Sequence, residues 1–569
     1  MTQKEAHTEP AGACMHLKSE GLSVYNTVYM DFLKKNKKII SLTMGLCIFL
    51  LGLFVVAFYI YKRCRSEYNA DFTDTILWAD AAVRSGHYYS PDYWYAYFLP
   101  FSGIPIMIPI VAVFGLTYFS HQLGMTVFAL IFAAALILFM KTLDFSYGES
   151  FALSGITMIL MCSSVTMRMI FYGHIIHYSL AIVFMCVAYA LYKRSSGFLE
   201  DGKRRRIFDI ALPIWCMLCC TNGMATFILF FVPFAGSILL ERYFGPDTIT
   251  YANDRKFFIR LASIAAGGLA GFGIKMILFG SVEYENSITA ILPTKDWLWT
   301  KSPLLLEWIK VFTGSNDIDV PMMSFDGIRI LVMYGFAVLL LVIPMFPAIF
   351  YKKIENRMLR LLTLFHWIMF AMTLLTYSIS YASVQTWRLS AVECSAAILT
   401  ITYTLYMLKE RKMLRWHVLL VPVLASVTFV SMLTVKNIPS AVGVNQNDQL
   451  IEIFRQNGLT RGYSFFWNSA NAAMVLSDNE ITVSPIDTYP DGRYEVKRYQ
   501  SEASGYEDVP GVDRYFVVVD SQDMKYVGDT LGKHRIDEIK YQDDLYIWIF
   551  DQNIFKDLEP VFCEPKTDE

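Results

Sequence analysis

Two carboxylates in a short polar stretch are the residues of this sequence best suited to proton-transfer chemistry. Asp71 and Asp74 follow the first long apolar segment, and a spacing of three residues puts both on one face of a helix. Such a pair can take a proton from a hydroxyl nucleophile at a membrane surface. Asp80 and Asp92 lie further along the same stretch. For each acid taken alone, a solvated loop position is the competing interpretation.

A second set of polar residues lies at the ends of later apolar segments. Arg388 begins the segment "WRLSAVECSAAILT", and its guanidinium can either clamp a phosphate through two parallel hydrogen bonds or anchor the chain at the membrane interface. Glu393 lies inside the apolar run, where a carboxylate is costly unless it is paired or functional. Lys275 can reach the same side of the membrane from its own segment. His174 and His177 begin another segment there, although a structural role is the simpler interpretation of both.

The composition indicates an integral membrane protein. Of the 569 residues, 55% are hydrophobic and only 18% are charged, which is more apolar than a soluble protein of this size. Ile39–Ile60 is long enough to cross a hydrocarbon layer of about 30 Å. The net charge of −2 argues against a nucleic-acid partner. With this first segment there are twelve candidate spans, the others being residues 103–118, 122–140, 151–167, 172–192, 207–221, 223–240, 259–280, 328–350, 361–379, 389–408 and 416–435.

Basic residues between these segments predict which ends face the cytoplasm. Three turns rich in Lys and Arg agree with one another as cytoplasmic turns, at residues 193–206, 352–360 and 409–415. The apolar run 210–240 is predicted to be a hairpin that turns at Thr221–Gly223, because Asn-Gly is a strong turn signal. The alternation then puts everything after about Val435 outside the cytoplasm.

The first half of the chain is harder to orient, because basic residues flank the first span on both sides. Twelve crossings would put the aspartates in the cytoplasm, whereas eleven would put them outside. Segment 103–118 is short and contains Pro105 and Pro109, so it is the best candidate for an irregular or re-entrant piece. After the last span the chain becomes polar, and its pattern predicts a small soluble α/β domain with a helix at 447–458 and strands at 480–486, 514–520 and 543–551.

Three motifs resemble those of GT-C membrane glycosyltransferases, the group that includes protein-O-mannosyltransferase-like and aminoarabinose-transferase-like enzymes. They are the acidic loop "DFTDTILWADAAVRSGHYY" with its re-entry "YWYAYFLPFSGIPI", the hairpin "CCTNGMATFILFFVPF", and the late span "WRLSAVECSAAIL" with the soluble tail that follows it. The chain departs from the family at Asn222, where many relatives have lysine, and at Leu389, where tyrosine is common. It also lacks the common Asp-Glu pair.

The resemblance implies a mostly α, polytopic helical membrane protein of the GT-C type, with about 11 transmembrane helices and a small C-terminal extracytoplasmic α/β domain. The first loop of the family faces away from the cytoplasm, which favours eleven crossings. Residues 1–37 are then a cytoplasmic N-terminal segment, 38–435 the membrane domain with the acidic outer loop 61–102, and 436–569 the extracytoplasmic domain. The expected location is the plasma membrane.

The implied activity is transfer of a sugar from a polyprenyl-phosphate donor to a glycan, lipid or protein acceptor outside the cytoplasm. Cleavage of the anomeric C–O bond leaves negative charge on the phosphate, so a cation is needed there and a carboxylate near the nucleophile. Asp74 and Asp71 are the implied catalytic carboxylates, and the implied substrate-binding residues are Arg388, Glu393, His174, Tyr97 and Lys275. No cofactor is expected, and a divalent metal is left open. The alternatives are a multispanning transporter, which would show internal repeats, and a polymerase or ligase of lipid-linked saccharides.

Overall fold

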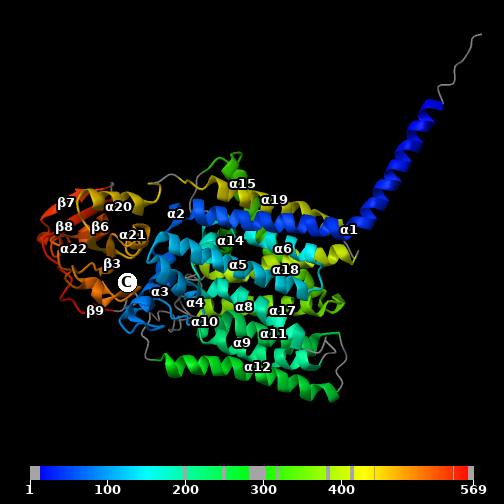
Figure 1. Cartoon of the computed structure of the whole chain (residues 1–569), viewed down its shortest axis with the longest axis horizontal. Coiled ribbons are helices and arrows are strands. Elements are labelled where there is room, and N and C mark those ends of the chain that lie inside the picture. The colour runs from blue at the N-terminus through cyan, green and yellow to red at the C-terminus, as the bar shows by residue number, and fades with distance from the viewer. Residues whose placement is uncertain are drawn as a thin grey trace, which may run out of the picture.

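The structure is a computed structural model that describes residues 13–195, 202–246, 251–280, 303–314, 320–379, 385–410, 415–440, 443–541 and 544–561. Figure 1 shows a bundle of helices with a smaller domain, which contains the sheet, at one end. Helices α3 and α4 lie at the end of the bundle that faces this domain (Figure 1). The predicted architecture, a polytopic helical protein with a C-terminal α/β domain, is confirmed.

Long apolar helices make up the bundle. Eight of the described helices are long and apolar enough to cross a membrane, or nine crossings result if one bent pair of helices counts as a span. The expected number of about eleven requires α8 and α9 to cross as well. The longer helices are α1 (Ala13–Lys62), α5 (Tyr118–Thr142), α6 (Tyr147–Leu160), α8 (His177–Ser195), α9 (Gly202–Cys220), α11 (Val232–Phe244), α12 (Tyr251–Leu278), α15 (Phe325–Val342), α17 (Arg357–Ile379), α18 (Ser390–Lys409) and α19 (Arg415–Asn437).

Shorter helices connect the long ones. They are α2 (Cys64–Glu67), α3 (Asp74–Ser85), α4 (Ile104–Phe114), α7 (Val165–Arg168), α10 (Met224–Thr226), α14 (Leu304–Thr313) and α16 (Met345–Ile349). Helix α4 has 11 residues and contains Pro109. At 1.5 Å per residue it extends about 16 Å, half the thickness of a bilayer core. The irregular segment predicted at 103–118 is therefore a short helix.

Paired glycines bring α1 into direct backbone contact with α6. A Cβ atom on Gly45 would lie 1.9 Å from the carbonyl oxygen of Gly148, and one on Gly52 would lie 2.8 Å from the carbonyl oxygen of Gly155. Close approach of this kind at small residues is a common way for helices to associate in membranes. It holds the first helix, which leads into the acidic loop, firmly against the bundle.

The prediction of a continuous span at 151–167 is wrong. Helix α6 ends at Leu160, and the segment Val165–Gly173, which combines α7 with the π-helical turn η2 (Met169–Gly173), turns away at 117°. The break follows from Ser164, whose Oγ accepts a hydrogen bond from Met167 N at 3.1 Å and caps a new helix. The same hydroxyl donates to Val311 O at 2.5 Å. An apolar pattern alone does not reveal a serine used in this way.

The C-terminal domain is built on a seven-stranded sheet of order β7-β8-β6-β2-β3-β4-β9. The central strand β2 (Arg461–Phe465) pairs in parallel with β3 (Thr482–Thr488) and β6 (Tyr515–Asp520). The predicted helix is α20 (Gln446–Gln456), and the three predicted strands are β3, β6 and β8 (Leu545–Phe550). The remaining elements are β4 (Tyr494–Lys497), β7 (Asp537–Lys540), β9 (Pro560–Val561), α21 (Ala472–Leu476) and α22 (Ser521–Val527).

The acidic loop and the C-terminal domain are joined by a second, two-stranded sheet. Strand β1 (Tyr93–Trp94) pairs antiparallel with β5 (Ser501–Glu502). A guanidinium–carboxylate pair between Arg65 and Asp448, with N and O atoms 2.6 Å apart, adds a further link. These contacts fix the acidic loop between the bundle and the domain, so the geometry of its carboxylates depends on both.

Candidate active site

The acid pair lies where a tight turn becomes a helix. Asn69 begins the 3₁₀ turn η1 (Ala70–Thr73) by accepting a hydrogen bond from Asp71 N at 3.0 Å. Asp74 is the first residue of α3, which ends at Gly86 in the left-handed region with φ +70°. A short polar side chain before the helix and a glycine after it are the usual boundaries of a helix. The predicted helical stretch behind the acids is thus present.

Both carboxyl groups are half-buried, and burial decides their ionisation. Removal from water raises the pKa of Asp71 to about 7, because the charged form loses its hydration. Burial also raises the pKa of Asp74 to about 7, and the neighbouring charge of Asp71 adds to the effect. Oδ1 of Asp74 has no hydrogen-bond partner among the described residues. A carboxyl of this kind can exchange a proton near neutral pH, as a general base requires.

Phe72, between the two acids in sequence, packs against the segment that precedes α8. Its ring centroid lies 6.1 Å from that of His174. A Cβ atom on Gly173 would lie 2.7 Å from the Phe72 ring, so this close packing requires glycine. On the neighbouring re-entry segment, a Cβ on Gly103 would lie 2.9 Å from the Thr75 side chain. The start of α3 is therefore held against the histidine segment and the re-entry.

Five polar side chains from four parts of the chain form what we call the cationic cluster: Tyr97, His174, His177, Lys275 and Arg388. The ring of Tyr97 lies 5.8 Å from that of His177. His174, Lys275 and Arg388 all act electrostatically on His177. The re-entry supplies Tyr97, the start of α8 the histidines, the end of α12 the lysine, and the 3₁₀ turn η5 (Thr386–Leu389) the arginine. Four of the residues that the sequence suggested for substrate binding are thus brought together.

Within this cluster, two neighbours orient the cations. The guanidinium of Arg388 lies over the ring of Tyr377, 5.6 Å from its centroid. Lys275 Nζ donates to the carbonyl oxygen of Asn222 at 3.5 Å. Gly223 has φ +84°, and a Cβ there would lie 2.4 Å from Lys275 Nζ. The glycine is thus needed both for the turn and for the approach of the lysine.

The predicted hairpin turn at Thr221–Gly223 also holds the re-entry. Asn222 Oδ1 accepts from Phe101 N, and its Nδ2 donates to Phe101 O, both at 2.8 Å. The amide thereby satisfies both backbone groups of one residue, as a neighbouring strand would. The amide at this turn therefore has a defined positioning role, and Lys275 brings a cation to it from another helix.

Comparison with known proteins identifies the fold. The chain resembles ArnT of Cupriavidus metallidurans, solved in the apo state. The TM-score is 0.50 with 10% sequence identity, over 88% of this chain and 97% of that one. No family model matches the sequence, and no curated protein matches it. ArnT has the GT-C fold, so the predicted fold resemblance is confirmed.

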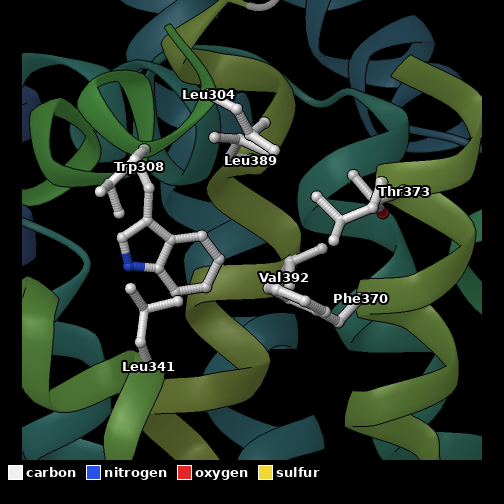
Figure 2. A pocket seen from close by; sticks show the side chains of 9 residues that line it. Leu304, Trp308, Leu341, Phe370, Thr373, Leu389 and Val392 are labelled. Carbon is white, nitrogen blue, oxygen red and sulfur yellow. The ribbon is translucent and has the colours of Figure 1, made fainter. Parts of the chain in front are cut away.

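The turn η5, which carries Arg388, contributes Leu389 to the wall of an apolar recess in this bundle. Its volume is about 120 Å³. It opens at the surface, since Leu305, one of the lining residues, is 61% exposed. Leu389, the residue after Arg388, forms part of its wall. Figure 2 shows the side chains that point into it: Leu304, Trp308, Leu341, Phe370, Thr373, Leu389 and Val392.

Glu393 lies apart from the other suggested site residues. It is fully buried in α18, and neither carboxyl oxygen has a hydrogen-bond partner among the described residues. It therefore does not bind Arg388 in this structure. In the described ranges no group of three or more His, Cys, Asp or Glu side chains is arranged to hold a metal ion.

Sequence reasoning missed two neighbours of the acids. His121, in α5, stacks 6.3 Å from Phe72, and neither ring nitrogen is paired within the described chain. A single histidine in an apolar span gives no signal of such a position. The other is Tyr93. Burial raises the pKa of its phenol, and the charge of Asp74 raises it further. The aromatic run "YWYAY" was a visible signal for it, although not for its direction.

Proposed function

We propose that this protein is a membrane glycosyltransferase that moves a sugar from a polyprenyl-phosphate donor to an acceptor hydroxyl. The observation that carries the proposal is the packing of the Phe72 ring on that of His174, which joins the segment that carries the acid pair to the segment that begins the cationic cluster. A reaction that releases a phosphate while deprotonating a hydroxyl needs these two charge types close together. The ArnT-like fold agrees with this chemistry.

In the proposed reaction the acceptor oxygen bonds to the anomeric carbon while the bond from that carbon to the phosphate oxygen breaks. The electron pair stays on the phosphate, where Arg388 and Lys275 neutralise the charge. The acceptor proton passes to Asp74, the preferred general base, and Asp71 assists by keeping the proton affinity of Asp74 high. Tyr97, which contacts His177, and His174, which contacts Phe72, are proposed to bind the donor.

The apolar recess supports a lipid-linked donor. Its wall includes Leu389, the residue after Arg388, and we propose that the hydrocarbon chain of the donor lies there with its phosphate at Arg388. Burial of such a chain contributes about 0.8 kcal/mol per methylene group. A donor carried on a nucleotide would make no use of this surface.

The donor class can be tested with the full chain in lipid nanodiscs. We expect release of polyprenyl phosphate from a polyprenyl-phosphate hexose in the presence of a membrane extract that supplies acceptors, and no consumption of nucleotide-linked hexose. Consumption of the nucleotide sugar alone would overturn the lipid-donor proposal. Movement of intact sugar across proteoliposomes without cleavage would favour a transporter instead.

We also propose that the acidic loop and the C-terminal domain lie on the extracytoplasmic side of the plasma membrane. Asp92 and Gln522 are exposed on these two parts, and Glu410 is exposed at the far end of α18. An impermeant thiol reagent added outside intact cells should label Asp92→Cys and Gln522→Cys but not Glu410→Cys. Labelling of Glu410→Cys alone would reverse the topology.

A further inference from the structure

A second cavity lies at the seam between α3 and the C-terminal domain. Its volume is about 240 Å³, and its walls come from both parts of the chain. Figure 1 shows the sheet domain directly beside α3. Small-molecule sites commonly measure about 300–1,000 Å³, so this cavity is sized for one small unit rather than an extended chain.

One wall of the cavity is made rigid by an arginine fork. Arg84 donates to both carboxylate oxygens of Glu502 at 2.8 Å and to Asp80 at 2.8 Å. Glu502 belongs to β5, whose pairing with β1 crosses the seam. A bidentate guanidinium–carboxylate pair fixes direction as well as distance. The seam therefore presents a defined polar surface.

The C-terminal domain also contributes amide, hydroxyl and guanidinium groups to the lining. Arg461 Nη2 donates to Ser504 O at 2.6 Å, while its buried Nε has no partner within the described chain. Asn471 has φ +61°, a strained value for a residue with a side chain, and is held there by bonds from its N to Val483 O and from its Nδ2 to Gln500 O. Strain of this kind is tolerated mostly where it serves a site.

Apolar atoms complete the lining. Leu77 and Met474 contribute side chains to the same cavity as these polar groups. A sugar ring presents hydroxyl groups that both donate and accept hydrogen bonds, and C–H faces that pack on apolar atoms. Amide, carboxylate and guanidinium groups can form hydrogen bonds with the hydroxyl groups, and the apolar side chains can pack on the C–H faces.

The cavity adjoins the acid pair. Leu77 follows Asp74 by three residues on α3, so the two lie on one helix face. Tyr93 lines the cavity, and its buried hydroxyl has no partner among the described residues. The same phenol is close enough to Asp74, Asp80 and Glu502 to interact electrostatically with all three. Tyr93 thus stands between the cavity and the preferred general base.

We infer that this seam cavity is the acceptor subsite and that it takes one monosaccharide unit of a glycan acceptor. The inference rests on the proposed function, because it assigns the cavity to the second substrate of the same reaction. The bound unit directs its hydroxyl past Tyr93 toward Asp74, and the rest of the glycan stays outside the cavity.

Saccharide binding by the full chain in nanodiscs tests the inference without any donor. The probes are methyl glycosides of neutral hexoses, N-acetylhexosamines and hexuronic acids, detected by saturation-transfer NMR. Arg461→Gln should weaken the binding of the best probe by about tenfold or more, as expected for loss of a charged hydrogen bond. Asn471→Gly should do the same. It relieves backbone strain but loses the bond to Gln500 O, so unchanged binding of polyprenyl-phosphate hexose is the check that this variant folds. Arg514→Gln, at an exposed arginine of the same domain, is the matched control.

The outcomes separate this inference from the proposed function. Loss of saccharide binding in both variants, with unchanged binding of polyprenyl-phosphate hexose, supports the acceptor subsite. Absence of saccharide binding, or binding that both variants leave unchanged, overturns it, while turnover of the lipid donor would still stand. Saccharide binding at the cavity without turnover of any lipid-linked sugar would overturn the proposed function and with it the acceptor role.

Discussion

Asp74 and Glu393 are two carboxyl groups with unpaired oxygens, yet they stand in different surroundings. Asp74 is half-buried at the start of a helix, three residues after a second carboxyl. Glu393 is completely enclosed in α18. Both have lost water, but only Asp74 keeps part of its side chain exposed. The comparison teaches that access to solvent and substrate, rather than burial, distinguishes a candidate base from a packed polar group.

Removal of the charge at Asp74 should give the largest effect. Asp74→Asn preserves size and should lower the kcat of sugar transfer by about 10²-fold or more, the range for loss of a general base. The measurement is release of polyprenyl phosphate at saturating donor. Asp71→Asn should lower kcat by a smaller factor, and the exposed Asp92→Asn should change kcat little. If Asp92 proved indispensable while both other acids tolerated the amide, the acid-pair proposal would be wrong.

Substitutions of Arg388 should have the second largest effect on sugar transfer. Arg388→Lys keeps the charge but loses the planar fork, so we expect the KM for the lipid donor to rise by about tenfold, with kcat less affected. Arg514→Lys, on the C-terminal domain, serves as the control. Unchanged transfer by Arg388→Ala would reduce this residue to a membrane anchor.

The pH dependence of the transfer rate gives a further test of Asp74 as the base. Because burial raises the pKa of Asp71 and Asp74 to about 7, the base is protonated below that pH, and the rate should fall by about tenfold per pH unit. Asp71→Asn removes a charge that raises the pKa of Asp74, so the acid limb should move to lower pH. A limb that stayed in place would show that Asp71 does not act on the base.

The same shifts affect stability. Folding raises the two carboxyl pKa values above their unfolded value of about 4. The folded state therefore loses stability as the pH rises from about 4 to about 7.

Glu393 should give the smallest effect. Glu393→Gln changes an enclosed carboxyl that has no hydrogen-bond partner in the described chain, so transfer should stay within about twofold of wild type. A loss comparable to that of Asp74→Asn would mean that this carboxyl reaches a substrate in another conformation. The distinction drawn between the two sites would then fail.

The sequence predicts the features that depend on neighbouring residues. The helix behind Asp71 and Asp74, the turn at Thr221–Gly223 and the strand β6 all follow from local spacing, and all are present in the structure. The GT-C fold could be predicted as well, since its motifs lie in short stretches. These features can be predicted because each depends on residues that are only a few positions apart.

Features that depend on distant packing could not be predicted. Ser164, at the break after α6, donates its hydroxyl to Val311 O, which lies 147 residues away. Glu393 is only five residues from Arg388, but the helix turns it into the core while η5 keeps the arginine in the cationic cluster. The seam cavity joins α3 to residues of the C-terminal domain, and no local pattern marks Arg461 as facing it.

The seam also sets the order in which this protein can be completed during synthesis. Arg84 and Glu502 are 418 residues apart. At about 5–20 residues per second, the ribosome needs about 20–80 s to supply the partner of a loop already made. Until then β1 has no β5 to pair with, and the seam cavity next to α3 lacks the residues of the C-terminal domain. A chain that stops before the last domain would leave this loop permanently open, so nascent fragments should carry an unfinished site.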